Sequence, residues 1–178
     1  MNDIPVLNKS ADRKLSIIND TPAIFTIVDS ESAVGRKPLY EVDSFSEVGK
    51  WCGLIIQQSK KYSVDPRLVA AIMYMETTHG RYDKVYPLRK TILPMNRHYS
   101  YWKDKDIGVT KEALGCPYYN IEFGIILLSR IQARIENPTI RKIATIYNFL
   151  GAEVVSDYGA RVANLYLEQP WSLAKCVV

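Results

Sequence analysis

The stretch that decides the fold is VDPRLVAAIMYMETTHG, residues 64–80. Asp65 stands directly before Pro66, an arrangement that predicts an N-terminal cap followed by proline at the first helical position. Gly80 is typical of a residue that ends a helix. We therefore expect a helix over 66–79, and no other segment of the chain gives a stronger helical signal.

This helix carries a glutamate where its core pattern expects an apolar side chain. Val69, Ile72, Met73 and Glu76 fall on one stripe, because residues three and four apart share a helix face. A buried carboxyl is usually paired, partly solvated in a cleft, or held in its protonated form. The protonated form is what a general acid needs near neutral pH. The alternative is that Glu76 lies in the last turn and swings into solvent or pairs with Arg81.

Capping residues and helical spacing of apolar residues predict further helices over 44–61, 120–137, 140–151, and from 154 or 156 to 167. Between 81 and 119 there are prolines and no sustained period, which predicts a loop with short helical turns. We interpret residues 1–43 as an N-terminal arm. Its β-favouring run AIFTIV, residues 23–28, is compatible with a short strand. The predicted fold is mainly α, with one helical domain over 44–178.

Composition excludes several classes of protein. With 47% hydrophobic and 24% charged residues, the chain is globular and not intrinsically disordered. A net charge of +4 suits a polyanionic partner but does not imply nucleic acid, and no apolar run is long enough for a membrane span. Cys52, Cys116 and Cys176 lack C-x-x-C spacing and do not indicate a disulfide framework. His79 and His98 lack a ligand pattern, so we expect neither a metal nor another cofactor.

Three short motifs resemble those of one enzyme family. The run VDPRLVAAIMYMET, residues 64–77, resembles the catalytic helix of the soluble lytic transglycosylases of the lysozyme superfamily, where "VDP", "LV-A-I" and "E-S" lead to the acid. Thr77 stands where the family usually has serine. The run NIEFG, residues 120–124, is similar to the family's "N-I-x-x-G", and IYNFLG, residues 146–151, is similar to its "A-Y-N-A-G".

The chain also departs from the family pattern. The family's "G-L-M-Q" loop is represented by LPMN, residues 93–96, which lacks the glycine. The tyrosine–asparagine motif has one extra residue before Gly151. The run ETTHG, residues 76–80, is also similar to the "E-S-H-x-G" of goose-type lysozymes. The resemblance spans roughly residues 47–167, and three motifs in the family's order make it moderately specific.

The resemblance implies a lysozyme-like fold and a peptidoglycan-cleaving glycosidase, either a lytic transglycosylase or a muramidase. Such enzymes cut the β-1,4 bond between N-acetylmuramic acid and N-acetylglucosamine. In lytic transglycosylases one glutamate acts first as acid and then as base, while the sugar's C6 hydroxyl attacks the anomeric carbon. The resemblance assigns both roles to Glu76 and implies that Tyr147 hydrogen-bonds it. The candidate substrate contacts are Thr77, Met95, Asn96, Tyr119 and Asn148.

The residues alone leave alternatives open. Tyr147, on the apolar stripe of its helix, also fits a core tyrosine bonded to a backbone carbonyl. Hydrolases usually add a second carboxylate, for which Asp83, Asp104 and Asp106 are candidates, although loop aspartates more often cap turns or stay solvated. The rings in the 81–119 segment either stack on sugars or cover the core; they are Tyr86, His98, Tyr99, Tyr101, Trp102, Tyr118 and Tyr119.

The implied substrate lies outside the cytoplasm, whereas the N-terminus lacks the apolar core of a Sec signal. We therefore expect the protein to act in the periplasm or cell wall after delivery by a specialised secretion system or a phage route. By analogy, an antibacterial effector with an immunity protein as partner is one such case. The competing function is a non-catalytic glycan-binding or assembly module on a lysozyme-like scaffold. The altered 93–96 loop keeps that alternative open.

Overall fold

The computed structural model describes residues 25–37, 45–83, 91–92, 94–95, 97–98 and 110–171. Its helices are α2 (Phe45–Tyr62), α3 (Pro66–Asp83), α5 (Lys111–Gly115), α6 (Pro117–Gln132), α7 (Ile140–Asn148) and α8 (Asp157–Glu168). The strands β1 (Thr91–Ile92) and β2 (Arg97–His98) pair antiparallel, with Thr91 opposite His98 and Ile92 opposite Arg97. The predicted mainly α fold class is therefore confirmed.

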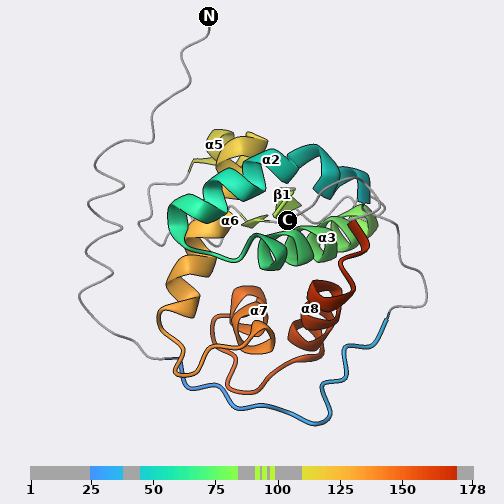
Figure 1. Ribbon diagram of the computed structural model, residues 1–178, viewed down its shortest axis with the longest axis vertical. Coiled ribbons are helices and arrows are strands. Elements are labelled where there is room, and N and C mark those ends of the chain that lie inside the picture. The colour runs from blue at the N-terminus through green and yellow to red at the C-terminus, as the bar shows by residue number, and fades with distance from the viewer. Residues whose placement is uncertain are drawn as a thin grey trace, which may run out of the picture.

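Helix α3 is the centre of the arrangement. It packs against α2 on one side and α8 on the other, while α6 packs against α2 and α7. Figure 1 shows α2 and α3 crossing the upper part of the molecule, with α7 and α8 side by side beneath them. Every residue from 68 to 78 is buried, so all faces of α3 are covered and not just the predicted stripe.

The observed helix ends differ from the predicted ones at specific residues. Helix α3 begins at Pro66 as predicted, but it continues through Gly80 to Asp83. A glycine inside a helix costs about 1 kcal/mol relative to alanine, which the packing of a central helix can offset. Helix α6 begins at Pro117, not at Asn120, because Pro117 occupies the favoured first position. It ends at Gln132, short of residue 137.

Local capping fixes the starts of the last two helices. The Thr139 hydroxyl accepts a hydrogen bond from the Lys142 N–H at 3.3 Å, which starts α7. The Ser156 hydroxyl accepts one from the Gly159 N–H at 3.3 Å, which starts α8. Helix α7 ends at Asn148, three residues before the predicted Gly151.

Residues 25–37, which we call the strap, cross the lower edge of the molecule beneath α7 and α8 (Figure 1). The sequence allowed a short strand over residues 23–28. In the described part of that run there are two isolated parallel bridges, Phe25 with Ile135 and Val28 with Val154. Ile27 and Ala33 are buried against the helices. This part of the N-terminal arm therefore packs on the helical domain.

The cysteines correct one sequence-based interpretation. Cys52 on α2 is disulfide-bonded, Cys116 has a free thiol, and Cys176 lies outside the described residues. Sequence spacing did not indicate this bond, because cysteines far apart in a chain can meet in the fold. None of the helices in the described part of the chain combines the length and hydropathy that a bilayer span requires.

Candidate active site

Glu76 is buried inside α3. Its side chain is 5% exposed, and the Tyr158 hydroxyl donates a hydrogen bond to its Oε1 at 2.5 Å. That length is typical of a hydroxyl bonded to a carboxylate. The alternative in which Glu76 swings into solvent from the last turn is therefore wrong, because α3 runs on to Asp83. The side chain of Arg81 lies outside the described residues.

Tyr158 reaches Glu76 because α8 lies antiparallel to α3. The two helices are tied at two levels by a phenol and a carboxylate: Tyr158 with Glu76, and Tyr166 with Asp65, whose hydroxyl-to-Oδ2 distance is 2.6 Å. Tyr158 lies in the first turn of α8, two residues after the Ser156 cap. The cap thus sets where the helix begins and where this hydroxyl points.

Asp65 also holds the start of α3. Its Oδ1 accepts the Arg67 N–H at 2.9 Å, and its Oδ2 lies 3.1 Å from the Arg67 guanidinium. Burial raises the pKa of the Asp65 carboxyl, but the hydrogen bonds from Tyr166 and Arg67 lower it by more, so the net pKa lies below its ordinary value. Because these partners favour the ionised form, Asp65 is a charged cap.

Sequence reasoning missed the role of Tyr158. A signal was present, since a tyrosine that packs its ring on the core seeks a hydrogen-bonding partner for its hydroxyl. A buried glutamate on another helix requires a donor. Nothing local in the sequence says that these two groups meet, because they are 82 positions apart.

A second group of residues converges on Met95. The Met95 N–H donates to the Asn120 Oδ1 at 2.8 Å, and the Asn120 amide nitrogen donates to the Leu114 carbonyl at 3.0 Å. The Met95 side chain is fully buried over Gly124, where an added Cβ would lie 2.8 Å from the Met95 Cε. The Tyr147 hydroxyl donates to the Met95 carbonyl at 3.4 Å.

The fold thus joins Met95 to Asn120, Gly124 and Tyr147, which belong to the three motifs downstream of the acid helix. Tyr147 is bonded to a backbone carbonyl, as the residue-based alternative expected. The hydrogen bond to Glu76 that the resemblance implies for Tyr147 stays a prediction. The side chain of Met95 is fully buried and does not offer an exposed contact.

Close packing of α7 on α8 connects the two groups. A Cβ at Gly159 would overlap the Thr145 Oγ1 and the Arg141 carbonyl oxygen, so the two helix backbones meet here almost directly. Thr145 stands two residues before Tyr147, and Gly159 stands one residue after Tyr158. The positions of the two phenols are therefore set by one helix crossing.

The other candidate contacts are spread over three elements. Thr77 is 3% exposed, and its hydroxyl oxygen has no hydrogen-bonding partner within the described part of the chain. Tyr119 lies in the first turn of α6, with its ring edge-on to that of Tyr118 at a centroid distance of 5.6 Å. Asn148 is exposed at the end of α7, and Asn96 lies outside the described residues.

The candidates for a second carboxylate are not placed by the structure. Asp104 and Asp106 lie outside the described residues, as do Tyr86, Tyr99, Tyr101 and Trp102, and no side chain is described for Asp83 or His98. Across the described ranges, no group of three or more His, Cys, Asp or Glu side chains is arranged to hold a metal ion.

A second buried glutamate, Glu122 on α6, plays a different part. It is 4% exposed, and its Oε1 accepts from the Lys61 ammonium at 2.9 Å and from the Tyr62 hydroxyl at 2.8 Å. Hydrogen bonds to Tyr62 and Glu122 hold the pKa of Lys61 well above its ordinary value. The positive charge of Lys61 thus offsets the negative charge of Glu122. The bonds of Glu122 to Lys61 and Tyr62 connect α6 to α2.

No protein-family model, no curated protein and no solved structure matches the chain. Its function is therefore inferred from the contacts of Glu76 and Met95 and from the resemblance of the short motifs.

Proposed function

We propose that this protein is a peptidoglycan-cleaving glycosidase, a lytic transglycosylase or a muramidase, with Glu76 as general acid and base. The bond cut is the β-1,4 linkage between N-acetylmuramic acid and N-acetylglucosamine. The observation that carries the proposal is a glutamate only 5% exposed whose carboxyl is fixed by a phenol at 2.5 Å. Buried glutamates are uncommon in proteins, and catalytic sites often hold them.

Cleavage begins when the Glu76 carboxyl gives its proton to the oxygen that leaves with N-acetylglucosamine, as the glycosidic bond breaks. Shielding from water favours the neutral carboxyl before this step. The Tyr158 hydroxyl fixes the rotamer of the side chain and stabilises the carboxylate that remains afterwards. One glutamate can therefore serve at both stages.

In the transglycosylase form, the carboxylate of Glu76 then takes the proton of the C6 hydroxyl while the C6 oxygen bonds to the anomeric carbon. The product is a 1,6-anhydro end, and Glu76 regains its proton. In the muramidase form, water replaces the C6 hydroxyl and the product is a reducing end. The two forms consume different nucleophiles and so differ in product mass by one water.

The hydrogen bonds of Asn120 and Tyr147 with the Met95 backbone, which we call the clamp, support the same proposal. A glycan-binding loop must hold its main chain in a fixed place, because positional errors of about 1 Å can reduce rates 100-fold. The Asn120 amide and the Tyr147 hydroxyl hold the N–H and the carbonyl of Met95. The net charge of +4 favours approach to an anionic wall. Periplasmic or wall localisation, the delivery route and an immunity partner belong to this proposal.

The test is digestion of purified peptidoglycan by the wild type and by Glu76→Gln, with the released products analysed by mass. Glu122→Gln is the matched control, because it makes the same change at another buried glutamate, whose partners are Lys61 and Tyr62 on α2. Circular dichroism checks that all three proteins are folded.

Anhydro-muropeptides that are lost only in Glu76→Gln support transglycosylation. Reducing ends that are lost only in Glu76→Gln support hydrolysis. If the folded wild type releases nothing, or if Glu76→Gln retains activity, the proposal is wrong. Glycan binding without release would then support the non-catalytic module.

A further inference from the structure

The strap is bonded to the first turn of α8, next to the residue that holds Glu76. The Asp157 carboxylate accepts two consecutive backbone N–H groups of the strap, with Oδ1 to Gly35 N and Oδ2 to Arg36 N both at 2.9 Å. Asp157 is the first residue of α8 and immediately precedes Tyr158. A single side chain thus connects the strap to the turn that carries the phenol.

At Gly35 the strap lies directly on the α8 backbone. Gly35 is buried and has a φ of +71°, a conformation that glycine adopts without strain. A Cβ at this position would lie 2.8 Å from the Ala160 carbonyl carbon and 2.8 Å from the Arg161 nitrogen. The contact therefore depends on the absence of a side chain.

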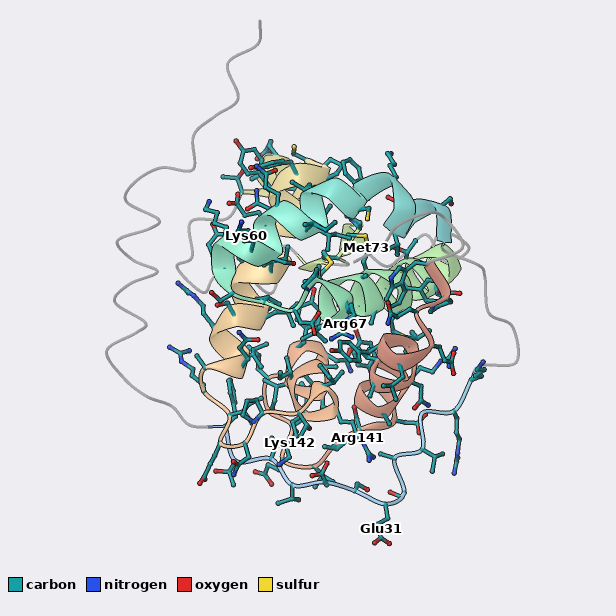
Figure 2. The ribbon with its side chains drawn as sticks, viewed as in Figure 1. Glu31, Lys60, Arg67, Met73, Arg141 and Lys142 are labelled. Carbon is teal, nitrogen blue, oxygen red and sulfur yellow. The ribbon has the colours of Figure 1, made fainter. Side chains whose placement is uncertain are left out.

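The strap is also held along α7. The Arg141 guanidinium donates to the Ser30 carbonyl at 2.9 Å and to the Ala33 carbonyl at 2.6 Å. The Lys142 ammonium lies 3.7 Å from the Asp29 carboxylate. Figure 2 shows Arg141 and Lys142 at the lower side of the helices, toward the strap. The strap is thus anchored on one helix and bonded to the start of the next.

We propose that the strap is a positioning element for the candidate active site. Through Asp157 it fixes the first turn of α8 and so holds the Tyr158 hydroxyl on Glu76. The first turn of a helix lacks internal acceptors for its N–H groups and frays readily, so a tertiary anchor there limits its motion. The inference rests on the proposed function of Glu76, and Asp157 and Gly35 act only through Tyr158.

The experiment uses the full chain with two variants that break the contact from opposite sides, Asp157→Ala and Gly35→Ala. The control is Glu168→Gln, which removes the surface pair of Lys37 and Glu168, 3.9 Å apart, at the other end of α8. Peptidoglycan cleavage is measured for each variant with Tyr158 present and with Tyr158→Phe. All assays are run at a temperature where circular dichroism shows folded protein.

We expect Asp157→Ala and Gly35→Ala to lower kcat about 10-fold with little change in KM, and Glu168→Gln to have no effect. In the Tyr158→Phe background the same changes should lower kcat less than about 2-fold, because the hydroxyl they position is absent. Equal losses in both backgrounds would show a merely structural role and overturn the inference.

A second measurement does not depend on activity. In protein labelled with ¹³C at glutamate carboxyl carbons, the Glu76 resonance is assigned by its loss in Glu76→Gln. We expect Asp157→Ala to move this resonance in the same direction as Tyr158→Phe does, and Glu168→Gln to leave it in place. An unmoved resonance in folded Asp157→Ala overturns the inference. An inactive wild type with a moved resonance contradicts only the proposed function.

Discussion

Replacing Gly159 with alanine tests the helix crossing on which the candidate site depends. The new Cβ would overlap the Thr145 Oγ1 and the Arg141 carbonyl oxygen. Thr145 has little freedom to move away, because its Oγ1 accepts the Ser156 N–H at 3.1 Å and its side chain is buried. The carbonyl belongs to the α7 main chain. The overlap can be relieved only if α7 and α8 separate.

The size of the effect follows from these contacts. Overpacking of a well-packed interior costs about 1–3 kcal/mol, and loss of the hydrogen bond between Thr145 and Ser156 adds about 1 kcal/mol. The higher helix propensity of alanine offsets at most about 1 kcal/mol of this destabilisation. We expect Gly159→Ala to lower the free energy of unfolding by about 2 kcal/mol. At Gly53 on α2 an added Cβ meets nothing within 4 Å, so Gly53→Ala should raise it by about 0.5–1 kcal/mol.

The assay is urea unfolding of both variants and the wild type in parallel, followed by far-ultraviolet circular dichroism. The midpoint should fall for Gly159→Ala and rise for Gly53→Ala, with the slope unchanged in both. If Gly159→Ala is as stable as the wild type, the backbones of α7 and α8 do not approach as closely as described. The placement of Tyr158 beside Glu76 would then lose its structural basis.

The remaining predictions concern single contacts. Tyr158→Phe should lower the rate of muropeptide release by about 10- to 100-fold, since a hydrogen bond to a charged group contributes about 1.5–3 kcal/mol; an unchanged rate would show that the phenol does not assist Glu76. Asn120→Ala should lower the free energy of unfolding by about 3 kcal/mol in thermal or urea unfolding, because two buried backbone groups lose their partner. An Asn120→Ala protein of unchanged stability would contradict the clamp. Because the folded pKa of Asp65 is lowered, its ionised form stabilises the protein above its ordinary pKa, and this contribution is lost as pH falls through the folded value. Stability measured from neutral pH downward should therefore fall less steeply for Asp65→Asn than for the wild type, and parallel curves would contradict the bond to Tyr166.

Local signals predicted the parts of the fold that depend on near neighbours. The pair Asp65 and Pro66 predicted the start of α3, and capping predicted the start of α7, because each cap contacts a residue two to three positions away. For the last helix the sequence predicted a start at residue 154 or 156, and α8 begins at Asp157. The end of α3 was mispredicted for the converse reason. Gly80 is a stop signal in isolation, but the packing of residues 68–78 stabilises a helix that continues through Gly80 to Asp83.

The candidate site was only partly predictable. Glu76 stood out because a carboxyl on an apolar stripe conflicts with the local pattern. Its partner Tyr158 could not be identified, because the two residues are 82 positions apart and no spacing rule connects them. The bonds of Asp157 to Gly35 and Arg36 span 122 and 121 residues, so the strap appeared only as an arm. Contacts of this range are set by the whole fold and not by a local pattern.

The clamp on Met95 has a chemical consequence that comes from its being an amide. Asn120 accepts with its oxygen and donates with its nitrogen at the same time, which neither a carboxylate nor an ammonium group can do. An amide side chain also keeps the same charge from acid to alkaline solution. The two hydrogen bonds of the Asn120 side chain, to Met95 and to Leu114, therefore do not depend on the acidity of the solution.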